Sequence, residues 1–169
     1  MWIYDTNEDN SARFTLGEYS NESKKTLLCF GVNPSTACPT ALDNTVRKVK
    51  TLCANNGYAN WIMLNIYPQR ATQPKDLHLQ RNDNLHKGNL AYITKVLKQF
   101  RNADILWAYG NLVDIRPYLK ACLQDVIAEI KANDFQGKFQ CIKVTKVGHP
   151  VHPLYQRNDS VFIDFNFHK

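Results

Sequence analysis

The stretch Leu27-Leu28-Cys29-Phe30-Gly31-Val32-Asn33-Pro34-Ser35 decides the fold class of this chain. Its first four residues form an apolar, strand-like run, and the glycine and proline that follow fix the backbone of a loop. A second strand-like run, residues 141–147, leads in the same way into Gly148-His149-Pro150-Val151-His152-Pro153-Leu154-Tyr155. Loops at the carboxyl ends of parallel strands meet at one edge of an α/β sheet. We therefore expect these two loops to form the two lips of one pocket.

Further apolar runs extend the pattern along the chain. We expect strands at residues 26–33, 61–66, 104–108 and 139–147. Apolar residues at helical spacing predict helices after residues 42–45, through residues 90–100 and from Pro117 to Asn133. The order β–α–β–α–β–α–β, with short connections, is typical of right-handed crossovers between parallel strands. The sequence therefore predicts an α/β fold with three layers, α/β/α, around a central four-stranded parallel sheet.

Length and charge bound the organisation of the protein. The 169 residues predict a single domain, residues 1–169. Residues 1–23 hold five acidic residues and one basic residue, and we expect them to form an acidic N-terminal strand or hairpin extension. The remainder holds 20 basic and 10 acidic residues, a net charge of +10. A basic body suits a polyanionic partner such as nucleic acid, and the alternative is that the charge serves solubility alone.

Several protein classes are disfavoured by what the sequence lacks. No apolar run approaches the roughly 18 residues of a membrane span, and residues 1–5 lack the features of a signal peptide, so we expect no membrane association and a cytoplasmic location. The five cysteines form no C-x-x-C pair and are expected to be reduced thiols. The glycine-rich motifs of ATP and NAD enzymes are absent, so we expect no cofactor and no metal.

Polar or turn-forming residues follow each predicted strand. Asn33 follows the first strand, Asn65 the second, Gly110-Asn111 the third and His149 the fourth. An asparagine amide offers an acceptor and two donors, which match the edge of a nucleobase. A histidine near neutral pH can donate, accept or carry charge. The pattern favours a pocket for a nucleobase, with Asn33, Asn65 and His149 at its edge.

Four segments resemble a bacterial and phage protein family of uncharacterised function. They are residues 31–35 (Gly-Val-Asn-Pro-Ser), 43–47 (Asp-Asn-Thr-Val-Arg), 64–74 (Leu-Asn-Ile-Tyr-Pro-Gln-Arg-Ala-Thr-Gln-Pro) and 146–155 (Lys-Val-Gly-His-Pro-Val-His-Pro-Leu-Tyr). This resemblance covers most of the chain and implies no particular activity.

A more distant resemblance is to the uracil-DNA glycosylase superfamily. Gly31-Val32-Asn33-Pro34 resembles the motif after the first core strand of those enzymes, and Met63-Leu64-Asn65 resembles the element that ends the second. Residues 105–110 (Ile-Leu-Trp-Ala-Tyr-Gly) resemble the third-strand element. His149-Pro150 followed by Pro153-Leu154 resembles the last motif with one residue inserted. The resemblance implies a uracil-DNA-glycosylase-like fold and cleavage of the bond between a base and its sugar.

Residue roles follow from this resemblance. Asn33 would position the water that attacks the sugar, and Asn65 would bind the polar edge of an extruded pyrimidine. His149 or His152 would stabilise the charge on the leaving base, and the inserted residue leaves open which of them aligns. Leu154 would fill the gap left in the duplex.

The chain also departs from the superfamily in three ways. Asn33 cannot act as a general base, so hydrolysis by it alone would be slow. Ser35 stands where the strict uracil enzymes carry an aromatic residue that blocks bulkier bases. Stacking on the base falls to Tyr67, Trp107 or Tyr109, because no phenylalanine follows the first motif.

The remaining candidates divide into two groups by expected partner. Residues expected to bind the substrate, besides Asn65 and Leu154, are Gly31, Pro34, Ser35, Arg70 and Tyr155. Residues expected to contact nucleic acid are Arg47, Lys143 and Lys146. Arg70 lies on the long polar connection of residues 67–83, where its guanidinium suits a bidentate contact to phosphate.

These observations support one leading hypothesis and two alternatives. The first is a protein that recognises a DNA base or nucleotide and hydrolyses the N-glycosidic bond of an abnormal or modified pyrimidine. The second is a non-catalytic nucleic-acid- or nucleotide-binding protein on the same fold. The third is an enzyme that acts on a free nucleoside or another small metabolite. If a polyanion binds at the pocket, four side chains should ring it, namely Arg47, Arg70, Lys143 and Lys146.

Overall fold

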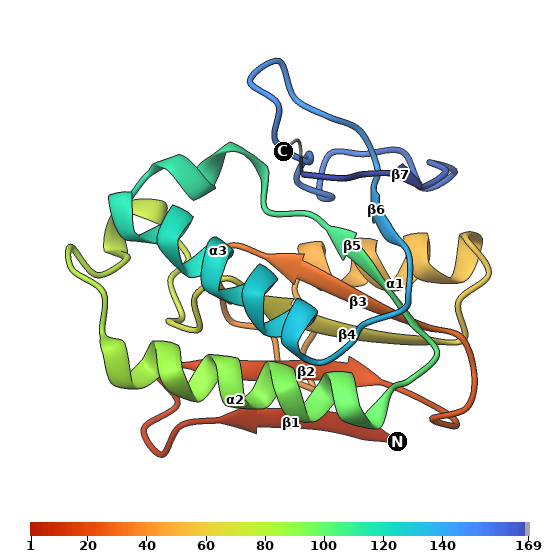
Figure 1. Cartoon of the computed structure of the whole chain (residues 1–169), viewed down its shortest axis with the longest axis horizontal. Coiled ribbons are helices and arrows are strands. Elements are labelled where there is room, and N and C mark those ends of the chain that lie inside the picture. The colour runs from red at the N-terminus through yellow and green to blue at the C-terminus, as the bar shows by residue number, and fades with distance from the viewer. Residues whose placement is uncertain (168–169) are drawn as a thin grey trace.

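A computed structural model describes residues 1–167 of the chain, which form one mixed sheet with helices on both faces (Figure 1). The strands are β1 (Trp2–Thr6), β2 (Arg13–Glu18), β3 (Thr26–Gly31), β4 (Asn60–Asn65), β5 (Ala103–Trp107), β6 (Phe139–Cys141) and β7 (Ile163–Asp164). Their order across the sheet is β1-β2-β4-β3-β5-β6-β7. The α/β class predicted from the sequence is therefore confirmed.

The sheet is larger than the four strands that were predicted. Four neighbours, β4, β3, β5 and β6, run parallel, as βαβ connections require. The hairpin β1–β2 adds antiparallel strands beyond β4, and β7 pairs antiparallel with β6. β1 buries one residue of five and β7 buries neither of its two, so few side chains of these outer strands reach the core. The uracil-DNA-glycosylase-like identity of the fold stays a prediction.

Three α-helices connect the parallel strands. They are α1 (Asn44–Asn55), α2 (Asp83–Gln99) and α3 (Pro117–Ala132), and short 3-10 turns, η1 (Pro74–Asp76) and η2 (Gly110–Asp114), lie in the connections. The side chain of Asp43 caps α1 by accepting from the Val46 N–H at 2.9 Å, and Asn82 caps α2 by accepting from the Leu85 N–H at 3.0 Å. α3 begins with proline, whose missing N–H costs nothing at a first helical position.

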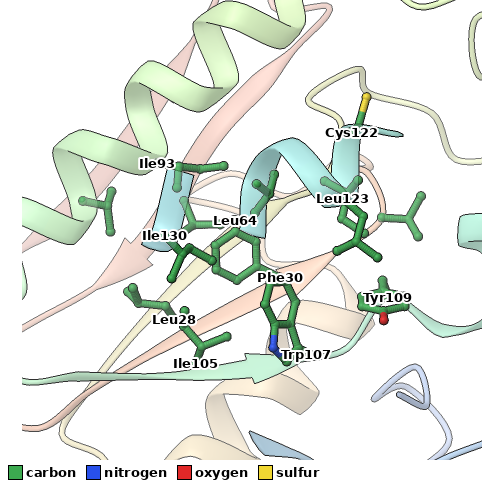
Figure 2. Packing of buried hydrophobic residues seen from close by; sticks show 14 of the residues in the cluster. Leu28, Phe30, Leu64, Ile93, Ile105, Trp107, Tyr109, Cys122, Leu123 and Ile130 are labelled. Carbon is green, nitrogen blue, oxygen red and sulfur yellow. The ribbon is translucent and has the colours of Figure 1, made fainter. Parts of the chain in front are cut away.

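The core has two halves because neighbouring residues of a strand face opposite sides of the sheet. Leu28, Phe30 and Trp107 face α2 and α3, and the rings of Phe30 and Trp107 lie 5.0 Å apart between centroids (Figure 2). Leu27 and Cys29 face α1 on the other side. The central strands β3, β4 and β5 are therefore apolar at most positions, with polar residues near their ends, which is why they could be read from the sequence.

The predicted fourth parallel strand is shorter than expected. β6 ends at Cys141, and the chain then turns back on itself: the Val151 N–H donates to the Lys143 carbonyl at 2.9 Å, and the Thr145 N–H donates to the His149 carbonyl at 2.7 Å. The turn relies on Gly148, which adopts a φ of +91°. Residues 143–151 thus form a small antiparallel loop instead of a continuous strand.

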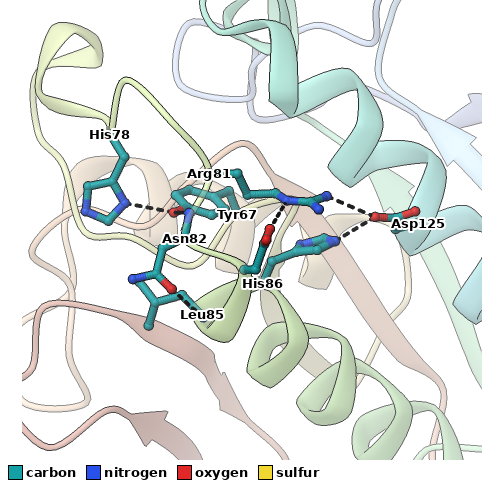
Figure 3. A network of polar contacts seen from close by, with 8 residues as sticks. Tyr67, His78, Arg81, Asn82, Leu85, His86 and Asp125 are labelled. Atoms are coloured by element: carbon teal, nitrogen blue, oxygen red, sulfur yellow. Dashed lines mark hydrogen bonds and ion pairs between the residues drawn. The ribbon is translucent and has the colours of Figure 1, made fainter.

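The long connection between β4 and α2 is held by many polar contacts (Figure 3). The Tyr67 hydroxyl lies 2.8 Å from His78 Nδ1 and accepts from the Asn82 N–H at 2.9 Å. Arg116 donates to the carbonyl groups of Lys75, Leu77 and His78. This connection is therefore fixed without regular secondary structure of its own beyond η1.

None of the helices in residues 1–167 has the length and apolar character needed to cross a membrane.

Candidate functional site

A cavity of about 630 Å³ opens at the carboxyl edge of the parallel strands. Its walls are residues 31–36 after β3, the start of α1, the end of β4, residues 71–74, residues 108–112 after β5 and residues 152–155 near the C-terminus, with Arg13 from β2. The loops after β3 and β6 therefore meet at one cavity, as their positions at strand ends predict.

Asn33 holds two of these walls together. Its amide nitrogen donates to the carbonyl of Pro34 at 3.0 Å, of Ala71 at 2.9 Å and of Gln69 at 3.4 Å. The donors of Asn33 are thus spent on the protein backbone. Asn33 lines the cavity, and its side-chain oxygen Oδ1 takes no part in those contacts.

Asn65 is a buried amide without a hydrogen-bond partner. Its side chain lines the cavity and is 1% exposed, and among residues 1–167 nothing accepts from its amide nitrogen. It stands opposite Gly31 in the parallel register of β3 and β4. A Cβ at position 31 would lie 3.1 Å from Asn65 Oδ1, so the glycine leaves the amide oxygen its space. A half turn of the amide exchanges the positions of its oxygen and nitrogen.

His152 is the histidine that lines the cavity. Its Nδ1 accepts from the Leu154 N–H at 3.2 Å, which leaves the proton of the neutral ring on Nε2. Burial lowers the pKa of His152, against a smaller opposing effect of the Asp43 carboxylate. The ring is therefore neutral near pH 7 and offers one N–H donor. The backbone of His152 packs on Gly110, whose φ is +60°.

His149 lies outside this cavity. It lines a separate cavity of about 230 Å³, and its Nε2 lies 2.8 Å from Asp114 Oδ2. Lys120 and His149 together lower the pKa of Asp114. The loop of residues 143–151 carries His149 away from Asn33 and Asn65, so the expectation that both histidines flank one pocket does not hold in this structure.

Two charged side chains line the cavity without having been predicted there. Arg13, from β2, and Asp43, the cap of α1, are its only Lys, Arg, Asp or Glu residues among those the structure describes. Asp43 was recognisable as a helix cap but not as a cavity residue. Arg13 was hidden because it alternates with apolar residues in what reads as an ordinary edge strand, whereas in the fold its N–H donates to the Pro68 carbonyl and its Nη1 to the Ala37 carbonyl.

Arg70 has a structural environment that the sequence did not indicate. Its guanidinium donates to the carbonyls of Ser35 and Ala37 and to the Tyr4 hydroxyl, and Nε donates to Asn10 Oδ1. Arg70 therefore holds the loop after β3 in place and does not line the main cavity. Ser35, which does line it, shares a hydrogen bond of 3.0 Å with Thr72.

The predicted nucleic-acid contacts lie away from the cavity walls. Arg47 is exposed on α1, where Nη1 donates to Asn44 Oδ1 at 3.2 Å. Lys143 and Lys146 are exposed on the loop after β6. None of these three lines the cavity, and neither does Arg70. The basic ring expected for a polyanion is therefore not formed by these four side chains.

The remaining predicted residues surround the opening. Gly31, Pro34 and Leu154 line the cavity, as does Tyr155, which is 89% exposed. Of the three aromatic residues considered for stacking, only Tyr109 lines it. Tyr67 and Trp107 are fully buried in the core. No group of three His, Cys, Asp or Glu side chains that could hold a metal ion occurs in the described part of the chain.

Comparison with known proteins identifies a family. The sequence model of a family described as "Protein of unknown function (DUF1643)" matches residues 13–154, so the chain belongs to that family. Neither the curated proteins nor the solved structures contain a match to the chain. The matched residues include every wall of the main cavity except Tyr155.

Proposed function

We propose that this member of the DUF1643 family binds one nucleobase in the main cavity and hydrolyses the N-glycosidic bond that joins the base to its sugar. The observation that carries the proposal is Asn65, an amide 1% exposed and unpartnered among the described residues, in a cavity that also holds His152 and Asp43. A buried amide without a partner costs about 1–3 kcal/mol. The edge of a pyrimidine supplies the donor and acceptor that such an amide lacks.

The side chains of the cavity fit the chemistry of this cleavage. As the bond breaks, the sugar becomes cation-like and the electron pair of the bond stays on the departing base. The Nε2–H of a neutral His152 is a suitable donor to the oxygen where that charge gathers. A preorganised donor of this kind is worth about 2.7–4 kcal/mol in the transition state.

Asp43 supplies a carboxylate that can act as a general base, which the amide of Asn33 cannot do. One of its oxygens caps α1, and the other is free of that contact. A water held by Asp43 and the Asn33 carbonyl oxygen would attack the sugar carbon and give its proton to the carboxylate. In this scheme Asn65, at the end of β4, holds the base. Asp43, at the start of α1, holds the water on the other side of the sugar.

The motifs that resemble the uracil-DNA glycosylase superfamily support this assignment. The loop after β3 and the end of β4 lie at strand ends, and the segment at His152 follows β6 through the loop of residues 143–151. Of the two histidines that the resemblance leaves open, the proposal takes His152. It also adds a carboxylate from the start of α1.

A free nucleoside or nucleotide is the second candidate substrate. The observation in its favour is that Arg47, Arg70, Lys143 and Lys146 do not line the cavity. A small substrate needs no such ring, whereas extrusion of a base from DNA costs a few kcal/mol that phosphate contacts must offset.

One experiment tests both substrate classes. The full chain is incubated with single- and double-stranded oligonucleotides that carry uracil, mismatched thymine or a 5-modified pyrimidine, and in parallel with the free nucleosides and nucleotides. Abasic sites and released bases are measured. We expect base release from at least one class, reduced at least about 100-fold by Asp43→Asn, which keeps a capping side chain but removes the charge.

The matched control is Asn82→Asp, which alters the cap of α2 away from the cavity and should leave the rate unchanged. Binding without base release would reduce the proposal to a non-catalytic reader. The absence of both binding and release for every substrate would contradict it.

A further inference from the structure

Arg13 is a buried charge for which the protein supplies little compensation. Its side chain is 2% exposed and lines the main cavity. Nη1 donates to the Ala37 carbonyl at 3.1 Å, and Nε has no acceptor in the described part of the chain. No carboxylate of residues 1–167 forms an ion pair with it. A guanidinium normally enters an interior only with a paired charge and a full set of hydrogen bonds.

The neighbouring Arg70 shows what full compensation looks like. All three of its nitrogens donate, to Asn10, to the carbonyls of Ser35 and Ala37, and to Tyr4. Burial lowers the pKa of Arg13 to about 10, and the charge of Arg70 contributes to this, so Arg13 remains charged at neutral pH. Arg13 and Arg70 therefore both donate to the Ala37 carbonyl, and the Asp43 carboxylate is the nearby negative charge.

The first turn of α1 faces the same cavity. Asn44, Thr45 and Val46 all line it. The cap of Asp43 occupies the Val46 N–H, whereas the first N–H groups of a helix have no acceptor within the helix. The helix dipole adds a positive potential at this end. Arg13 and the first N–H groups of this turn are therefore donors that line one cavity, with the Asp43 carboxylate as the nearby negative group.

We propose that Arg13 and the first turn of α1 form an anion subsite of the main cavity, which binds the phosphate group of a nucleotide whose base lies against Asn65. The placement of the base against Asn65 rests on the proposed function. The phosphate site is argued separately, from Arg13 and the first turn of α1. The fork of a guanidinium and the N–H groups of a helix terminus are the two groups that suit phosphate oxygens best.

Isothermal titration calorimetry of the full chain tests the subsite. The probes are inorganic phosphate, the deoxynucleosides of uracil, thymine and cytosine, and their 3′- and 5′-monophosphates. We expect inorganic phosphate to bind, and any nucleoside that binds to gain at least about tenfold in affinity from one of the two phosphate positions. Arg13→Met should abolish both effects, and Arg13→Lys should restore part of them, since it keeps the charge but not the fork.

Arg157→Met is the matched control, because it removes the same charge two residues beyond Tyr155. Arg157 is exposed and pairs with Asp159, so this variant should bind phosphate as the wild type does. Phosphate binding without any nucleoside or nucleotide binding would support the subsite and contradict the proposed function. Wild-type protein that fails to bind phosphate, or Arg13→Met protein that binds it equally well, would overturn the subsite.

Discussion

Two buried charges, one at each edge of the sheet, have opposite environments. At the amino edge of the parallel strands, Asp104 is 2% exposed and pairs with Lys25 at 2.8 Å, with the Lys138 N–H at 2.8 Å and with the Tyr58 hydroxyl at 2.8 Å. At the carboxyl edge, Arg13 is equally buried, and a single carbonyl accepts from it. The protein thus contains one buried charge with a complete set of partners and one without.

The same contrast appears along one strand. Asn60 begins β4 and donates to the Asn21 carbonyl and the Thr26 hydroxyl, while its own oxygen accepts from the Ser20 N–H. Asn65 ends β4 with its amide nitrogen unpartnered in the described structure. Six buried side-chain atoms of the described residues lack a partner, and the two that belong to residues lining the main cavity, where a ligand can reach them, are Asn65 Nδ2 and Arg13 Nε.

The largest expected effect separates the two buried charges. Asp104→Ala should lower the free energy of unfolding by about 3–5 kcal/mol, because Lys25 and the Lys138 N–H lose a charged acceptor and the Tyr58 hydroxyl keeps only Gln140. Arg13→Met should change it by no more than about 1 kcal/mol, because Ala37 keeps its bond from Arg70. Urea denaturation without ligand measures both. Equal losses of unfolding free energy in the two variants would contradict the difference between the two buried charges.

The next effect compares the two ends of β4. Asn60→Ala should destabilise the protein by about 2–3 kcal/mol, since three hydrogen bonds are lost. Asn65→Ala should cost less than about 1 kcal/mol and should abolish nucleobase binding in calorimetry, whereas Asn60→Ala, measured where it is folded, should retain it. A ranking in which Asn65 matters more for stability would assign it a structural role.

The smallest expected effect is the pH dependence from His152. Burial lowers its pKa in the folded state below the ordinary value of 6.5, so the unfolded state binds more protons as the pH falls. The free energy of unfolding should therefore decline as the pH drops through 6.5, and His152→Gln should flatten that decline. Nucleobase affinity should fall at lower pH, as the folded protein itself takes up a proton, because a proton on Nδ1 would face the Leu154 N–H. A variant with the wild-type slope would count against this reading.

The sequence predicts the parts of this fold that depend on burial along a short stretch. β3 and β4 are buried at nearly every position, and Asp43 has the chemistry of a helix cap, so both could be read directly. A strand or hairpin was expected in residues 1–23, but its pairing with β4 depends on contacts that are distant in sequence. β7 was not expected as a strand, because it has two residues and buries neither of them.

The candidate site divides in the same way. Asn33, Asn65 and His152 lie in loops or at strand ends, and the rule that such positions share an edge brought them to one cavity. His149 departs from the rule because Gly148 reverses the chain, which turns its imidazole toward Asp114. Arg13 lies far from the motifs in sequence and reaches the cavity through strand pairing alone. Their functional roles stay predictions.

Gly110 controls how closely His152 approaches the loop after β5, although Gly110 itself does not line the cavity. A Cβ at this position would stand 3.3 Å from the Cβ of His152 and 3.5 Å from its backbone nitrogen, and the φ of +60° at Gly110 is one that larger residues rarely adopt. A larger residue there would strain the backbone and crowd His152 at a contact that must give by a few tenths of an ångström, although no side chain that lines the cavity had been replaced. The placement of the imidazole thus depends on a residue that has no side chain.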